Sequence, residues 1–157
     1  MGIAITNQGL KVSKVRNVKT PTRGTEGSAG IDFYIPSDYP ALEIENVMPG
    51  QSVFIPSGIK ANVPAGFALI AFNKSGVALK KDMTVGACVV DSDYQGEIHL
   101  HLTNVGTKPT TLNPGDKLVQ FLLVPVDHGA VEVVKIDNLY TEQTNRGSGG
   151  FGSTGTK

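Results

Sequence analysis

The chain has 157 residues, and its 14 Lys and Arg balance its 14 Asp and Glu, so the formal net charge at pH 7 is +0. That length suits one domain with its own core, and the balanced charge leaves no basic excess to hold DNA or RNA, so no nucleic-acid polymer is expected as a partner. Cys88 is the only cysteine, which fits a reducing compartment, and the longest apolar runs are too short to span a bilayer. We therefore expect a protein of the cytoplasm, or of the host cytoplasm if the source is viral, without membrane contact.

Short apolar, β-branched runs separated by proline and glycine turns predict an all-β chain. Strands are expected at residues 52–56, 59–63, 67–72, 98–103, 117–126 and 131–136. Only residues 75–81 suit a short helix, with Ser75 as its cap. We expect a β-sandwich or barrel over residues 1–140, followed by a flexible, glycine-rich arm over residues 141–157.

Two polar clusters precede the middle of the chain. Asp32 follows a glycine turn and precedes an apolar run, where it could orient water or a metal shell, or simply form an Asx turn. Lys74, Ser75 and Gly76 follow an apolar strand and offer a cation, a hydroxyl and free N–H groups at one place. That combination suits a phosphate, although an ordinary capped turn remains the alternative.

Further polar residues interrupt the second half of the chain. Asp91 ends an apolar run at the mouth of an expected hairpin, where it could serve as a general base, bind a metal together with Asp93, or be a plain turn residue. Asp116 and Lys117 are placed to pair across a turn. Gln120 interrupts an otherwise apolar strand, and its amide needs partners from the protein or from a ligand.

His99 and His101 share one face of an alternating strand. They could bind a metal together, but no third ligand is evident, so a solvated or subunit-facing surface is the preferred interpretation. Cys88 has no partner cysteine and is expected to be a small core residue.

Five segments in this order resemble the five motifs of the trimeric dUTP pyrophosphatases (dUTPases). They are residues 29–32 (AGID), 74–76 (KSG), 86–97 (GACVVDSDYQGE), 115–120 (GDKLVQ) and 146–155 (RGSGGFGSTG). The resemblance runs from about residue 21 to 155. Each motif alone is weak, but five in the family's order are specific.

The resemblance implies a jelly-roll β-sandwich that assembles as a homotrimer with active sites at the subunit interfaces. It implies hydrolysis of dUTP to dUMP and pyrophosphate, with Mg²⁺ bound mainly through the substrate phosphates. This activity would cleanse the nucleotide pool of dUTP and supply dUMP for dTMP synthesis.

The resemblance also assigns residues to roles. Asp91 stands where the family's general base activates water, and Tyr94 where the family's tyrosine packs under the deoxyribose. The hairpin with Val85, Val89 and Val90 would face uracil, with His99 near the same base. The phosphates would meet a set of polar and glycine residues: Lys74, Ser75, Gly76, Gln120 from a neighbouring subunit, and Arg146.

The remaining roles concern support and closure. Asp32 and Asp116 would support the site's network, with Asp32 reaching the metal through water. The arm would close as a lid, with Phe151 stacking on uracil and three further residues adding contacts: Gly152, Ser153 and Thr154.

The chain departs from the family at two motif positions. Lys74 stands where the family usually has arginine, which keeps the charge but loses the planar fork. Cys88 stands where it usually has glycine, so the cysteine side chain must point into the core. The acidic excursion at residues 37–47 has no functional account from sequence.

Three other functions are alternatives to the dUTPase. A dCTP deaminase shares the fold, a nucleotide-gated regulatory protein would use the same scaffold to hold a partner, and a jelly roll without a ligand would leave residues 74–76 and the arm unexplained.

Overall fold

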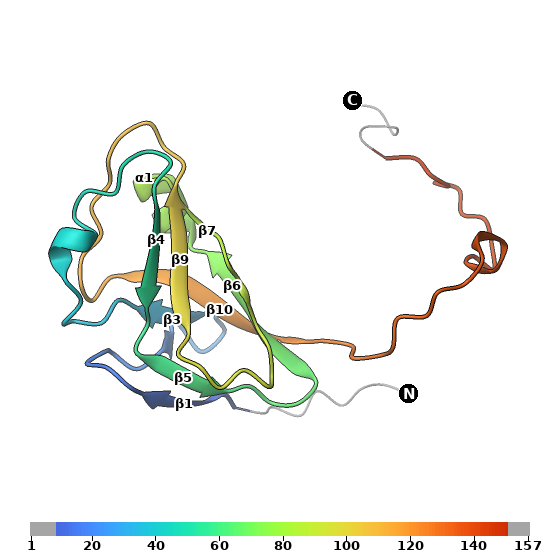
Figure 1. Ribbon diagram of the computed structural model, residues 1–157, viewed down its shortest axis with the longest axis horizontal. Helices are drawn as coiled ribbons and strands as arrows, with labels where there is room; N and C mark the ends of the chain where they lie inside the picture. Colours follow the sequence, from blue (N-terminus) through green and yellow to red (C-terminus); the bar gives the residue numbers. More distant parts are fainter. Residues whose placement is uncertain (1–8, 151–157) are drawn as a thin grey trace. The chain divides into compact units, whose positions relative to one another are not determined.

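The computed structural model describes residues 9–150 of the chain (Figure 1). It divides into two compact units, residues 1–127 and 128–157. The first unit contains the strands, a single α-helix and the 3-10 helix η1, and the second contains the 3-10 helix η2, as far as the structure describes them. Within residues 9–150 no helix is long and apolar enough to cross a membrane.

The elements follow one another in this order: β1 (Lys11–Lys14), β2 (Thr22–Arg23), β3 (Ile31–Tyr34), η1 (Ala41–Glu43), β4 (Ser52–Pro56), β5 (Ile59–Asn62), β6 (Phe67–Asn73), α1 (Ser75–Lys81), β7 (Met83–Val85), β8 (Val89–Val90), β9 (His99–Asn104), β10 (Lys117–Pro125) and η2 (Ile136–Asn138). The predicted β architecture with one short helix is confirmed.

Three antiparallel sheets build the first unit. Their strand orders are β1-β5, β2-β3-β10-β6-β8 and β4-β9-β7. In Figure 1, β4 and β9 run side by side, and β1 lies beside β5. β10 is central because its apolar run pairs with β3 on one edge and with β6 on the other.

Alternation along β9 and β4 explains which side chains reach the core. Leu100 and Leu102 are buried, whereas His99 and His101 point to the other face of the strand. β4 alternates in the same way, since Ile55 is buried and Phe54 is 61% exposed. The core also contains a tilted aromatic pair, Phe33 and Phe121, with ring centroids 4.5 Å apart.

Glycine completes the predicted turns where the backbone must take positive φ. Gly50, Gly66 and Gly115 have φ of 77°, 80° and 85°, a region that L side chains rarely adopt. Each lies at a turn that the sequence predicted.

The excursion at residues 37–47 is part of the packed unit. Ile44 is fully buried, and its carbonyl accepts a hydrogen bond from the Leu112 N–H at 2.9 Å. Val47 forms an isolated antiparallel bridge with Thr110. The segment therefore has a structural role that its acidic composition did not predict.

The strand expected at residues 131–136 is not formed. Val131 and Val133 are 96% and 95% exposed, and the only regular element nearby is η2. A strand requires a hydrogen-bonding partner, and the second unit does not offer one within its described residues. The two compact units divide after Asp127. The functional boundary predicted at residue 140 stays a prediction.

Candidate active site

A pocket opens in the first unit beside β8 and the loop that leads to β9. The hairpin that the sequence predicted here is not formed, because β8 pairs with β6 whereas β9 pairs with β4 and β7. The pocket takes in five of the predicted residues: Val89, Val90, Asp91, Tyr94 and His99. Asp91 is exposed, and its carbonyl accepts the Tyr94 N–H at 3.2 Å, which tightens the turn after β8. β8, the loop after it and the start of β9 thus bring the residues predicted for the base, the sugar and the attacking water to one cavity.

Tyr94 lies over a glycine. Its hydroxyl donates to the Glu97 carbonyl at 2.8 Å, and its ring occupies the space that a side chain at Gly96 would need. Gly96 is therefore required for this position of the tyrosine ring.

Cys88 lines the same pocket and packs partly against the core. It is half-buried, so its placement is less enclosed than the sequence predicted. Its carbonyl accepts the Ala71 N–H at 2.7 Å, which attaches the residue before β8 to β6.

Phe54 was missed by sequence reasoning, although it lines the pocket. Its ring stacks on His99, with centroids 4.4 Å apart and planes 6° apart, and meets the edge of His101 at 5.9 Å. The period-two pattern of its strand, with Val53 and Ile55 buried, was the signal that places it on the outer face with both histidines.

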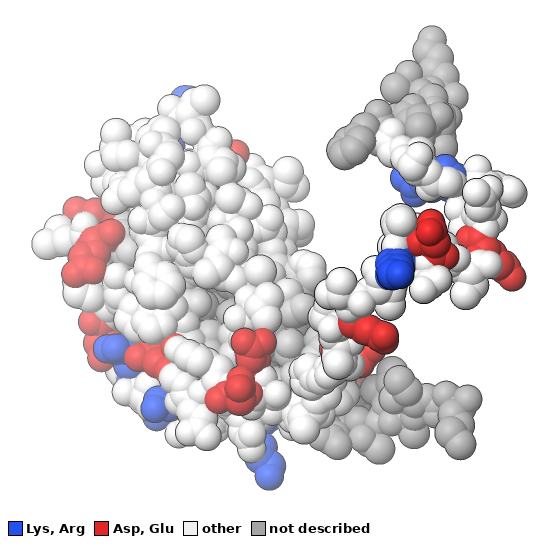
Figure 2. Space-filling model, turned by 45° about the vertical axis from the view of Figure 1, so that its right-hand side comes forward, with Lys and Arg blue, Asp and Glu red and all other residues white. Residues whose placement is uncertain are grey.

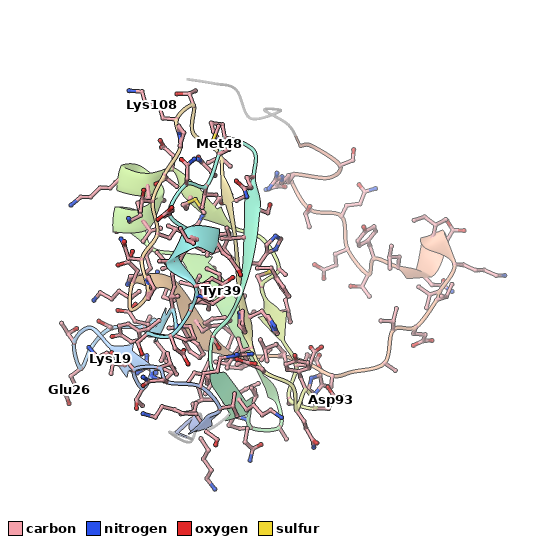
Figure 3. All side chains as sticks on the ribbon, turned by 60° about the vertical axis from the view of Figure 1, so that its left-hand side comes forward. Lys19, Glu26, Tyr39, Met48, Asp93 and Lys108 are labelled. Carbon is pink, nitrogen blue, oxygen red and sulfur yellow. The ribbon has the colours of Figure 1, made fainter. Side chains whose placement is uncertain are left out.

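The sequence left open a metal site at His99 with His101 or at Asp91 with Asp93. Among residues 9–150, no three His, Cys, Asp or Glu side chains gather to hold a metal ion. Asp93 is exposed, and Figure 3 places it on the β8–β9 loop, at the opposite end of the first unit from Met48 and Lys108.

A second cluster surrounds Asp32, whose side chain is only 5% exposed. Lys74 pairs with one of its oxygens, and the Lys117 Nζ lies 3.3 Å from the other. The expected pair of Asp116 with Lys117 is therefore wrong. Asp116 instead accepts the Asn113 N–H at 3.0 Å and lies 3.8 Å from the Lys81 Nζ.

The register of the central sheet assembles this cluster. Gln120 of β10 lies opposite Asp32 of β3 and opposite Phe72 of β6. Its amide donates to the Asn73 carbonyl at 2.8 Å and fills the space above Gly30. The partner that the buried amide was expected to need is thus a backbone carbonyl.

Helix α1 begins directly beside this cluster. Lys74 is its N-cap residue and makes no side-chain capping bond, so Ser75 is not the cap that the sequence predicted. Ser75 and Gly76 are exposed in the first turn, where backbone N–H groups have no acceptor within the helix.

Asn73 connects the two parts of the site and was also missed. Its Oδ1 accepts the Val85 N–H at 2.7 Å, and its Nδ2 donates to the Thr84 hydroxyl at 3.3 Å. The residue before the Lys-Ser-Gly segment therefore holds the end of β7, from which the chain leads to the pocket.

The arm is described only in part. The Arg146 Nε donates to the Gly149 carbonyl at 2.8 Å within the second unit. The predicted residues Phe151, Gly152, Ser153 and Thr154 lie outside the described residues.

Charges of both signs are mixed on the face of the first unit in Figure 2, and its upper part carries few of them. No single-sign tract dominates this face, which agrees with the balanced composition.

Comparisons with known proteins address the family. The family model described as dUTPase matches residues 16–155. A deoxyuridine 5'-triphosphate nucleotidohydrolase of Desulfitobacterium hafniense is 40% identical over 147 residues, covering 92% of both chains. The enzyme of the same name from Chlamydia pneumoniae is 41% identical over 137 residues, covering 86% of this chain and 90% of its own.

Solved structures agree on the fold. A mutant dUTPase of Staphylococcus bacteriophage 80alpha with dUpNHpp superposes with a TM-score of 0.77 at 19% identity, covering 96% of this chain and 99% of its own. The dUTPase from phage phi11 of S. aureus gives a TM-score of 0.70 at 19% identity, covering 85% of this chain and 100% of its own. The chain belongs to the dUTPase family, as its five motifs predicted, and is by that membership a nucleotidohydrolase.

Proposed function

We propose that the protein hydrolyses dUTP to dUMP and pyrophosphate by direct attack of water on the α-phosphorus. The observation that carries the proposal is the pocket beside β8 and the loop that leads to β9, which gathers Asp91, Tyr94 and His99. Family membership suggests the substrate, dUTP. The pocket contains the residue types that would contact the uracil base, the deoxyribose and the attacking water.

Uracil would be held by the segment from Val85 to Val90, which runs from the end of β7 through β8. Its backbone donors and acceptors would imitate the edge of a pairing base, while Val89, Val90 and Phe54, which line the pocket, exclude water. Tyr94, whose ring occupies the space beside Gly96, would pack under the deoxyribose and leave no room for a 2′-hydroxyl.

The triphosphate would lie near the start of α1. Ser75 and Gly76 would donate hydrogen bonds, while Lys74 and Lys117 supply positive charge. Gln120 lies in the same cluster as Lys74, and in the assembled trimer this cluster would reach the phosphates of a nucleotide held by a neighbouring subunit. Asp32 keeps both lysines at one place, because each of its oxygens pairs with one of them.

The same pairing bears on Mg²⁺. Both oxygens of Asp32 are engaged, so this carboxylate does not fit a direct metal ligand. We propose that Mg²⁺ arrives as part of the substrate, bound to the triphosphate. Asp32 would reach it through water only if a lysine moved away.

Asp91 would accept a proton from the attacking water. The water oxygen forms a bond to the α-phosphorus as the bond to the bridging oxygen breaks, and pyrophosphate leaves with that oxygen. This reaction needs positioning and charge neutralisation rather than a covalent enzyme intermediate.

We further propose a jelly-roll trimer in which the arm of one copy completes the site of another. The exposed apolar residues Val131, Val133 and Ile136 support this proposal, since the described part of the second unit does not cover them. Arg146, together with residues 151–154, would then close over the nucleotide. The work of this enzyme would be to remove dUTP from the nucleotide pool of the cytoplasm and to supply dUMP.

A nucleotide panel tests the function. The purified protein should release pyrophosphate from dUTP, with little release from dCTP, dTTP or UTP and no ammonia from any of them. Ammonia release from dCTP would replace the proposal with a deaminase. Failure to release pyrophosphate from dUTP in the presence of Mg²⁺ would overturn it.

A further inference from the structure

One backbone carbonyl, that of Glu97, contacts two side chains that line the pocket. The Glu97 carbonyl oxygen accepts the Tyr94 hydroxyl at 2.8 Å and lies 3.0 Å from the His99 Nδ1. Both side chains line the pocket, so the position of the Glu97 peptide sets the position of both.

The same contact fixes where His99 carries its hydrogen. A carbonyl oxygen can only accept, so the Nδ1 of His99 must be the donor. In the neutral ring the Nε2 is then unprotonated and can accept a hydrogen bond. His101 on the same strand has the opposite arrangement, because its Nδ1 accepts the Ala87 N–H at 2.8 Å.

The stack on Phe54 restrains the plane of the His99 ring, since the two planes differ by only 6°. The carbonyl contact and the stack together leave the imidazole one orientation. The Glu97 peptide therefore orients both Tyr94 and His99 in the pocket.

The side chain of Glu97 is anchored by Arg16 and by the backbone of Gly58. The Arg16 Nε donates to its Oε1 at 2.7 Å, and the Arg16 Nη2 donates to its Oε2 at 3.1 Å. The Gly58 N–H also donates to Oε1 at 2.8 Å. The bidentate fork and the backbone bond together hold the carboxylate more rigidly than a single contact would.

The anchor is itself well fixed. Gly58 has φ of 74°, its carbonyl accepts the Val15 N–H at 2.8 Å, and a side chain at this position would collide with Arg16 and Val18. Hydrogen bonding to Arg16 holds the pKa of the Glu97 carboxyl below its ordinary value, so the carboxylate is charged at neutral pH.

We propose that the Arg16–Glu97 pair is a positioning device for substrate recognition. It fixes the Glu97 peptide, whose carbonyl holds Tyr94 against Gly96 and keeps His99 in the form with hydrogen on Nδ1 and an acceptor at Nε2. The acceptor is available to an N–H group of the bound nucleotide. Its identification as the dUTP site rests on the proposed function, whereas the positioning itself does not.

The test uses Glu97→Gln and Arg16→Met in the full-length protein. Each change should raise the KM for dUTP about tenfold and leave kcat within about twofold, because binding is disturbed while Asp91 is untouched. The preference for dUTP over UTP should fall as Tyr94 loosens. Arg16→Lys should recover only part of the KM, since lysine restores the charge without the fork.

A spectroscopic readout separates positioning from simple stability. In the nitrogen NMR spectrum, His99 should change from a ring protonated at Nδ1 to a mixture of both forms in Glu97→Gln. Glu43→Gln is the matched control, because Glu43 also accepts a side-chain hydrogen bond, from Tyr39 at 2.9 Å, but lies on η1. The control should leave the KM and the His99 signal unchanged.

An unchanged His99 signal together with an unchanged KM in Glu97→Gln would overturn the proposal. A loss of kcat at constant KM would overturn it as well. If Glu97→Gln fails to fold, Arg16→Met provides the same readouts, because Arg16 is the more exposed partner and the Gly58 contact remains. The NMR signal needs no turnover, so it decides the positioning even if the wild-type protein does not hydrolyse dUTP.

Discussion

Asp32 and Asp91 have the same side chain, but their different surroundings suit them to different roles. Asp32 is buried and holds two lysines, which is a task of orientation. Asp91 is exposed at the pocket, where water and a nucleotide can both reach it. A general base must touch the water that it activates, so the exposed aspartate is the candidate.

Replacing Asp91 with asparagine should separate chemistry from binding. The amide keeps the shape but cannot take the proton, so we expect kcat to fall about a thousandfold while dUTP still binds. Single-turnover kinetics and calorimetric binding of dUTP measure the two effects. Asp93→Asn, an exposed aspartate on the same loop, is the control and should retain activity. Normal turnover of Asp91→Asn would assign the base elsewhere.

At the scale of elements, sequence predicted what depends on local pattern. The alternation in β9 and the apolar run of β10 identified both strands, and the positive φ of Gly50 and Gly115 follows from their turn sequences. β1 and β2 were missed because they are short, mostly exposed and polar, so no apolar period marks them.

Long-range pairing was beyond sequence reasoning about single segments. Nothing in the segment 117–120 says that Lys117 will meet Asp32, since that contact depends on the register between β10 and β3. The same holds for Arg16 and Glu97, which are 81 positions apart. The motif residues were predictable from the resemblance, whereas the residues that hold them, such as Asn73 and Phe54, required the fold.

The Arg16–Glu97 pair joins the segment after β1 to the loop before β9, and its contribution should depend on pH. Because the pKa of Glu97 lies below the ordinary value of 4.5, its stabilising effect is present above that pH and is lost as the pH falls through the folded-state value. The difference in unfolding free energy between wild type and Glu97→Gln should therefore shrink below pH 4.5. Urea titrations of both proteins, at several pH values from neutral to below 4.5, measure this difference in unfolding free energy. A difference that grows in acid would contradict the assignment.

At the scale of the whole molecule, the two units differ in what they bury. The first has an aromatic and aliphatic core that includes Phe33, Phe121 and Leu100. The second exposes the apolar side chains Val131, Val133 and Tyr140. Exposed apolar groups do not stabilise a single chain, whereas they can stabilise a contact with another protein surface. This contrast is the physical reason to expect that residues 128–157 work on another copy.

Truncation after Asn145 should leave a folded protein with little turnover. The first unit keeps its whole core, so thermal unfolding should change little, while the loss of Arg146 and the residues that follow should remove the proposed closure over the nucleotide. Circular dichroism melting and pyrophosphate release measure the two effects. Full activity would mean that the glycine-rich end has no part in the reaction.

Mixing two inactive proteins tests whether the arm acts on another copy. Asp91→Asn chains keep the arm but lack the base, and chains truncated after Asn145 keep the base but lack the arm. If the arm of one copy completes the site of another, co-expression should restore part of the activity, because a truncated chain then receives an arm from an Asp91→Asn chain. Light scattering of the mixed protein reports whether it is a trimer.

Co-expression of full-length Asp91→Asn with truncated Asp91→Asn is the control and should stay inactive. A mixed trimer without recovered activity would show that each arm closes over the active site of its own subunit. The trimer would then not be needed for one subunit's arm to complete another's site.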